Sequence, residues 1–204
     1  MSRDLAICII SILFLASCGG GGGSSGASPD VSAFGAARDG LRSLYDRSED
    51  LDYTELSAAR LGGSYSYAGY VGLSRIGNAS SLTVDEINRQ LADIEPEDFL
   101  DTPQVTGRFA MTANFNRGTI AGRVTDFQRA NDQPVAGELT LGEGRIDDGY
   151  FHYSATLAGN YNGAAIANGL LLGDFGGEKA EYAGGALAFQ AGGDAIAGVF
   201  LGGR

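Results

Sequence analysis

Residues 108–115 read Arg-Phe-Ala-Met-Thr-Ala-Asn-Phe, and residues 119–125 read Thr-Ile-Ala-Gly-Arg-Val-Thr. In both stretches apolar side chains alternate with small or polar ones. This is the period of two expected of a strand with one buried face and one wetter face. The turn sequence Asn116-Arg117-Gly118 separates the stretches. Together they predict an antiparallel hairpin.

Outward from this hairpin, the same pattern recurs between glycine-rich turns. The predicted strands cover residues 64–75, 106–116, 118–127, 136–146, 149–158, 163–173, 180–190 and 194–202. The last three carry many glycines and alanines on both faces, which allows close strand contact. Eight sequential strands with short turns predict an all-β fold, an eight-stranded antiparallel β-barrel. A short helical segment is expected before it.

The first and last strands of this barrel are expected to pair with each other. Closure would pair the first strand, near Tyr65 to Leu73, with the last, near Ala195 to Leu201. Pairing them removes the open edges that glycine- and alanine-rich strands would otherwise present for aggregation. Phe200 is then expected to point into the barrel.

The N-terminal sequence predicts lipid attachment. An apolar run over residues 5–17 ends in Leu15-Ala16-Ser17-Cys18. It is too short to span a bilayer and suits a signal peptide. The ending resembles the bacterial lipobox, which implies cleavage before Cys18 and acylation of that cysteine. The alternative is an ordinary secretory signal with a stray cysteine.

Four regions follow from these patterns. They are a lipoprotein signal peptide (1–17), the lipidated cysteine with a Gly/Ser tether (18–29), a helical handle or stalk (30–60) and the barrel (61–204). The five consecutive glycines of the tether lack the lysine and strand context of a phosphate loop. They therefore indicate a flexible spacer.

One long excursion, residues 76–105, interrupts the strands. It carries a run of acids, Asp93, Glu95, Glu97, Asp98 and Asp101, beside apolar residues such as Phe99. Long insertions between strands are often functional. Asp93, Glu95, Glu97, Asp98 and Phe99 are therefore the candidate binding loop. A basic protein is the partner that such a loop suits. The alternatives are a solvated acidic loop and a segment that caps one barrel mouth.

Composition excludes several functions. The formal net charge of -11 at pH 7 opposes nucleic-acid binding, since both partners would be negative. The cysteines, Cys8 and Cys18, both lie near the N-terminus, so neither a disulfide nor a cysteine metal site is expected in the barrel. His152 is the one histidine. No pairing of nucleophile and base is visible, so neither an enzyme nor a metal site is expected.

The C-terminal sequence resembles a known family. The run from Gly173 to Gly185 and the closing run from Gly198 to Arg204 are similar to the transferrin-binding protein B β-barrel domain. The hairpin at Asn114–Thr119 and the first strand at Gly63–Tyr70 resemble it as well. The matched motif positions are Phe175, Gly177, Ala180, Gly184, Gly185, Gly198 and Phe200. Two positions depart from the family pattern, Glu178 in place of a proline and Tyr182 in place of an acid.

This resemblance implies an outer-membrane, lipid-anchored binding module. It would be displayed at the cell surface or on the periplasmic face. Its ligand is then expected to be a host or environmental molecule, with an iron or haem carrier as one candidate and a TonB-dependent receptor as a further partner. No cofactor is expected, although Tyr150 or His152 would be the ligand if haem were bound. The alternatives are a structural envelope lipoprotein without a ligand and a transmembrane barrel.

Overall fold

The structure is a computed structural model that describes residues 32–52, 54, 61–78, 86, 89, 96–147 and 152–204. Helix α1 (Ala33–Ser48) precedes the strands, and helix α4 (Pro96–Asp101) follows the first strand. The strands are β1 (Ser64–Asn78), β2 (Val105–Asn114), β3 (Thr119–Arg129), β4 (Pro134–Val135), β5 (Gly137–Ile146), β6 (Tyr153–Tyr161), β7 (Ala164–Gly176), β8 (Tyr182–Ala191) and β9 (Asp194–Gly203).

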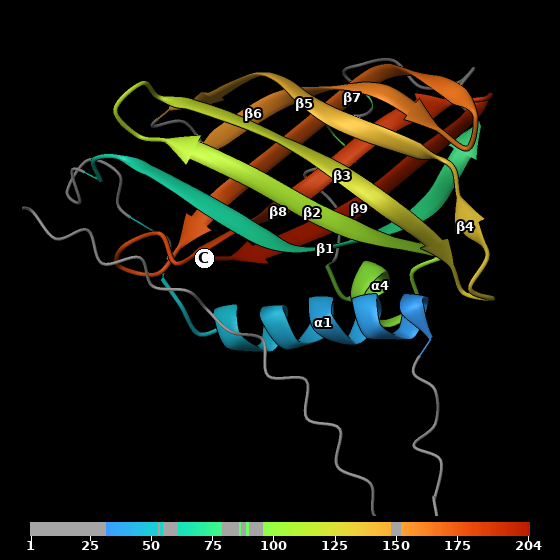
Figure 1. The fold of residues 1–204 in the computed structure, drawn as a ribbon, viewed down its shortest axis with the longest axis horizontal. Helices are drawn as coiled ribbons and strands as arrows, with labels where there is room; N and C mark the ends of the chain where they lie inside the picture. The colour runs from blue at the N-terminus through green and yellow to red at the C-terminus, as the bar shows by residue number, and fades with distance from the viewer. Residues whose placement is uncertain are drawn as a thin grey trace, which may run out of the picture. The chain divides into compact units, whose positions relative to one another are not determined.

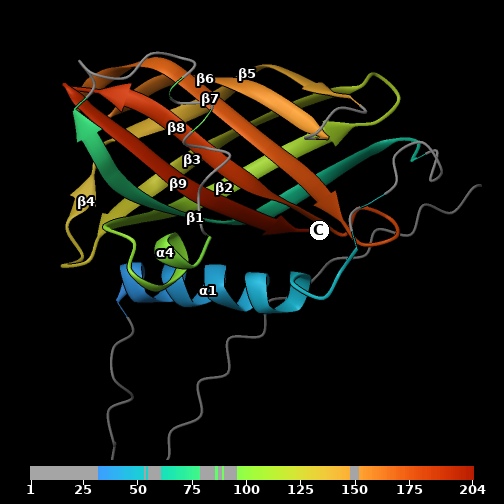
Figure 2. The same cartoon turned by 180° about the vertical axis from the view of Figure 1, so that it is seen from behind.

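The eight long strands close into an antiparallel barrel (Figures 1 and 2). Strand β1 pairs with β2 on one side and with β9 on the other, and β2 pairs in turn with β3. The two-residue β4 adds to the end of β3. The predicted fold class is confirmed. So is closure of the first strand on the last, where Leu73 lies opposite Gly198.

Inward-facing side chains fill the barrel. The ring centroids of Phe109 and Phe200 lie 4.6 Å apart, and those of Tyr153 and Phe175 lie 4.7 Å apart. Phe200 is 1% exposed and belongs to the interior cluster with Phe109, which confirms its predicted inward direction. An interior of eight strands is about filled by side chains. Recognition is therefore left to the outer wall and the two rims.

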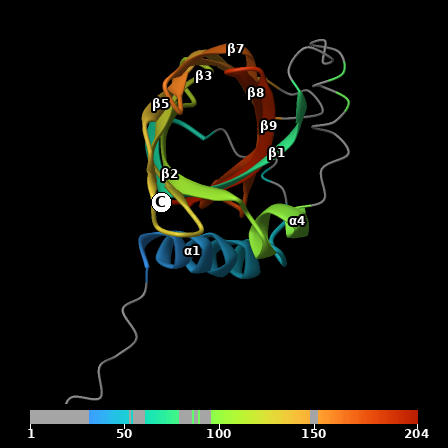
Figure 3. The same ribbon diagram turned by 90° about the vertical axis from the view of Figure 1, so that its right-hand side faces the viewer.

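Figure 3 shows α1 and α4 lying against the outside of the barrel. A second apolar cluster lies on the outer wall and includes residues of both helices. Because successive strand residues point to opposite faces, Val199 faces outward while its neighbour Phe200 faces the interior. The buried members of this outer cluster are Leu41, Phe99, Leu100, Ala188, Ala197 and Val199. Parts of β8 and β9 are thus covered on both faces, which explains their small residues and weak alternation.

Helix α1 forms where an amphipathic sequence meets this wall. The Ser32 side chain accepts a hydrogen bond from the Gly35 backbone N–H at 2.9 Å, which caps the first turn. Phe34, Ala37, Leu41 and Leu44 form the buried face. The helical segment expected within residues 30–60 therefore spans 33–48. Leu51, which continues the apolar spacing, lies beyond the helix and is 40% exposed.

The strands depart from the predicted boundaries in a few places. Strand β6 begins at Tyr153 in the described residues, and the predicted start at residue 149 lies outside them. Strand β8 begins at Tyr182 because Ala180 turns the chain with a φ of +56°. Register shifts, such as that between Arg75 and Gly77, interrupt several strand pairs. Bulges of this kind bend and twist a strand locally.

Candidate functional site

Helix α4 is attached to the barrel wall by its apolar residues. Phe99 and Leu100 are 7% and 2% exposed and pack beside Leu41 of α1. Gly72 of β1 makes this approach possible, since a Cβ at that position would collide with the Phe99 carbonyl oxygen. Phe99 and Leu100 therefore lie outside the barrel and do not plug its interior.

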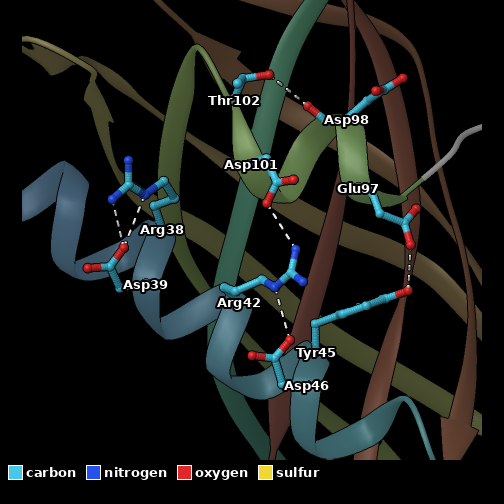
Figure 4. Close-up of polar contacts among 9 residues, drawn as sticks. All are labelled: Arg38, Asp39, Arg42, Tyr45, Asp46, Glu97, Asp98, Asp101 and Thr102. Atoms are coloured by element: carbon cyan, nitrogen blue, oxygen red, sulfur yellow. Dashed lines mark hydrogen bonds and ion pairs between the residues drawn. The ribbon is translucent and has the colours of Figure 1, made fainter.

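Polar contacts join α4 to α1 at the edge of this attachment (Figure 4). Arg42 donates to Asp46 on its own helix and to Asp101 on α4, each at 2.9 Å. The Tyr45 hydroxyl donates to a Glu97 carboxylate oxygen at 3.0 Å. Partial burial raises the pKa of Tyr45 above its ordinary value, and the bond to Glu97 raises it further. The phenol thus stays protonated as a donor at neutral pH.

The residues of the candidate binding loop have different environments. Glu97 and Asp98 are exposed residues of α4, and Glu97 accepts the hydrogen bond from Tyr45 of α1. Phe99 is buried and serves the attachment instead. Asp93 and Glu95 lie outside the described residues. We call the exposed surface formed by Glu97, Asp98 and Asp101 the acidic platform. It offers fixed carboxylates to a positively charged group.

His152 lies just before β6, beside β7. Its backbone N–H donates to Asp174 Oδ1 at 3.0 Å, and its ring Nδ1 lies 3.3 Å from the same oxygen. Burial raises the pKa of Asp174, although the bond from the His152 backbone opposes that shift. Tyr150, the other candidate haem ligand, lies outside the described residues. Haem ligation stays a prediction.

The family-motif residues build the barrel wall and its turns. Phe175 and Phe200 lie in the core. A Cβ at Gly185 or at Gly198 would collide with the backbone of a neighbouring strand. Gly177 and Ala180 have positive φ angles in the β7–β8 turn. The Ala180 carbonyl accepts a hydrogen bond from the Tyr67 hydroxyl at 2.9 Å. In the structure, these positions contribute to folding rather than to an exposed site.

Three further points concern the lipidation site, metal-ligating clusters and membrane-spanning helices. Cys18 and the tether lie outside the described residues. Across the described ranges, no three histidine, cysteine, aspartate or glutamate side chains gather as a metal site would require. In those same ranges, no helix has both the length and the apolar character to cross a bilayer.

Sequence reasoning missed a hollow on the outer wall. It has a volume of about 640 Å³ and lies over β1, β2 and β3, next to Arg204. Exposed residues on its lining are Ser66, Ala68, Ala110, Thr112, Arg123 and Arg204. One signal was available, because Arg108 and Arg123 fall on the wetter faces of two adjacent predicted strands.

Comparisons with known proteins give no match by sequence and distant matches by structure. No protein-family model matches the chain, and no curated protein matches it. Among solved structures, intact Ap-TbpB, with its N and C lobes, is similar with 14% identity and a TM-score of 0.45. A mutant of the vaccine antigen transferrin-binding protein B from Haemophilus parasuis Hp5 has 15% identity and a TM-score of 0.44. Each alignment covers 74% of this chain and 28% of the other, so the matched region is little more than a quarter of those proteins.

Proposed function

We propose that this chain is a lipid-anchored binding module of the bacterial outer membrane, whose acidic platform captures a basic protein ligand. The observation that carries the proposal is the fixed position of Glu97 and Asp98. Both are exposed, whereas the next two residues, Phe99 and Leu100, are buried against the barrel. Carboxylates on an anchored element need little ordering when a partner binds.

Charge supports a basic partner. The chain carries 25 acids against 14 lysines and arginines, so its long-range field attracts positive proteins. On the platform, Arg42 neutralises part of the charge of Asp101. Within the described residues, the Asp98 carboxylate forms no ion pair and can meet a cation. Complementary charge of this kind mainly raises the rate of association.

The lipid anchor is the second part of the proposal. A sulfur-linked diacylglycerol and an N-terminal acyl chain on Cys18 would hold the protein firmly, since one chain alone binds a membrane only marginally. The glycine-rich tether would let the barrel stand away from the bilayer. We infer display at the cell surface, and protease treatment of intact cells separates that placement from the periplasmic face.

The ligand class follows from the sequence resemblance. A host iron or haem carrier is the first candidate, with a TonB-dependent receptor as the further partner. Two other classes compete with this function. A structural envelope lipoprotein would have no ligand, and a spanning barrel would face lipid. Arg108 and Arg123 are exposed on outward faces of β2 and β3, where a lipid-facing wall would be apolar. Their exposure favours an aqueous surrounding.

The test is capture by the immobilised full chain from host serum and from haemoglobin-containing lysate. The variant Glu97→Gln/Asp98→Asn removes both charges at nearly constant shape, and the introduced glutamine amide oxygen still accepts the hydrogen bond from Tyr45. The variant is expected to lower the affinity for the captured basic protein about tenfold, mainly through slower association.

The matched control is Asp126→Asn/Glu138→Gln, which removes two exposed charges from β3 and β5. It should bind as the wild type does, and all three proteins should melt alike. Equal capture by both variants would show that the platform is not the site. If no protein is enriched over a protein-free surface, the structural envelope role replaces the binding role.

A further inference from the structure

We propose that the hollow over β1, β2 and β3 binds an acidic, extended peptide segment of a partner protein. We call it the arginine groove, and define it by Ser66, Ala68, Ala110, Thr112, Arg123 and Arg204. Arg108 does not line the hollow but lies near it on β2, diagonal to Arg123 in the β2–β3 register. This proposal does not depend on the acidic platform, which has the opposite charge and lies on a different element.

The floor of the groove is made by small side chains. Ala68 lies directly opposite Ala110, and Ser66 lies opposite Thr112. All four are exposed, whereas their chain neighbours Tyr67 and Met111 are only 1% and 2% exposed and point into the barrel. The hollow therefore opens outward. Its floor offers methyl groups and hydroxyls to a bound chain.

Positive charge gathers around this floor. Arg123 lies opposite Ala110, and Arg108 lies opposite Thr125 on the same strand pair. The two arginines are thus diagonal neighbours, with Cα atoms about 7–8 Å apart for such pairs. Arg204 lines the other side, and its guanidinium lies 4.2 Å from the centroid of the Tyr65 ring. Like charges in this arrangement repel one another.

In the described part of the chain, little compensates this repulsion. Neither Arg108 nor Arg123 takes part in an ion pair there, and Arg108 stacks instead over Tyr70 at 4.7 Å. Arg204 lies 3.9 Å from a Glu181 carboxylate oxygen, which is at the limit of an ion pair. No aspartate or glutamate is among the lining residues that the structure describes. An anionic ligand would relieve the repulsion.

Carboxylates of a peptide fit this site better than a membrane surface does. The planar guanidinium group binds carboxylates through two parallel hydrogen bonds. A peptide can enter the groove alone, whereas docking on an anionic bilayer would bring the whole protein of net charge -11 close to negative headgroups. The methyl groups of Ala68 and Ala110 on the floor add contacts for side chains between the acids.

The experiment measures binding of a fluorescent peptide, Glu-Leu-Glu-Ala-Glu-Leu, to the full chain by anisotropy. The double variant Arg108→Gln/Arg123→Gln should weaken binding at least tenfold. Raising the salt concentration should weaken binding to the wild type, because the pairs are exposed. Arg129→Gln removes an exposed arginine from the far end of β3 and should change the affinity less than twofold.

A second variant tests the groove itself without altering its charge. Ala110→Tyr places a large side chain on the exposed floor and should abolish binding while the melting temperature stays close to that of the wild type. Wild-type affinity in Ala110→Tyr, or equal loss in Arg129→Gln, would overturn the proposal in favour of non-specific attraction. Binding to vesicles containing anionic phospholipid but not to the peptide would overturn it in favour of a membrane contact.

Discussion

Gly72 sets how closely α4 approaches the barrel wall. Its missing side chain leaves room for the carbonyl oxygen of Phe99, and Leu41 lies just beyond. Gly77, on the same strand, has open space where a Cβ would be. Substitution of Gly77 therefore serves as the control for substitution of Gly72.

Gly72→Ala is expected to lower the free energy of unfolding by about 1–3 kcal/mol, the range for overpacking a filled site. Gly77→Ala should be neutral or stabilising by up to about 1 kcal/mol, since alanine restricts the unfolded chain. Urea denaturation of both variants measures the difference. Equal effects on the free energy of unfolding would mean that α4 can move away from β1 without loss of stability.

A second residue, Phe200, lies in the interior of the barrel, and its substitution tests how tightly the core is packed. It contacts Phe109 at 4.6 Å and Tyr153 at 6.4 Å between ring centroids. Phe200→Ala should cost about 3–5 kcal/mol, as for other buried aromatic residues. Thr119→Ala, on an exposed position of β3, should change stability by less than about 0.5 kcal/mol. A small loss in Phe200→Ala would contradict a tightly packed interior.

At the scale of elements, α1 is held by apolar contact more than by charge. Leu41 has no exposed surface, whereas Arg42 makes its pairs with Asp46 and Asp101 in solvent. Exposed ion pairs are screened and contribute little. The attachment should therefore withstand high salt.

Leu41→Ala is expected to lower the unfolding free energy by about 2–5 kcal/mol through the cavity it leaves. Arg42→Gln should leave it unchanged within error, with or without added salt. Hydrogen exchange in α1 gives a local readout, because detachment would expose its amides. Salt-dependent exchange in the wild type would show that the ion pairs, and not the apolar contacts, hold the helix.

Strands could be predicted from the sequence where one face is exposed to solvent and the other is buried. Phe109, Met111 and Ala113 alternate with polar or small residues. This period of two identifies the buried face and the exposed face of β2. The outer faces of β8 and β9 have no such alternation, because Ala188 and Val199 are buried in the same cluster as Leu41 and Leu100 of the helices. The candidate site was harder to predict. The acid run indicated exposure, but the burial of Phe99 depends on Leu41 and Ala197, which are distant in the sequence.

At the scale of the whole barrel, three buried tyrosines are expected to make the free energy of unfolding depend on pH in the alkaline range. Burial raises the pKa of Tyr67, of Tyr153 and of Tyr161 above the ordinary value of about 10. Above that pH the unfolded chain loses phenol protons that the folded barrel holds more tightly. The free energy of unfolding should then fall as the pH rises, by at most about 1.4 kcal/mol per pH unit for each tyrosine that stays protonated in the folded barrel.

Urea midpoints at pH 8.5, 10.5 and 11.5 test this dependence, with phenolate absorbance followed in the folded protein. Tyr161→Phe should reduce the slope, because this phenol then no longer contributes to the difference in bound protons between the two states. Ordinary titration of all phenols in the folded state would contradict the burial of these rings.

The anchor belongs to the same scale. Cys18→Ser should abolish incorporation of labelled fatty acid, because only a thiol accepts the diacylglycerol. Cys8→Ser, in the predicted signal peptide, should leave labelling of the mature protein unchanged. Label that persists on the Cys18 variant would contradict the lipobox.

The pairing of β1 with β9 also determines when the barrel can form. The first strand finds one of its two neighbours only among the last residues of the chain, where Val71 meets Phe200 and Leu73 meets Gly198. Contacts so distant in sequence make folding slow, since a long loop must close before they form. Until then the chain exposes two strand edges. The barrel is therefore most vulnerable to aggregation and proteolysis in the interval before its final strand is in place.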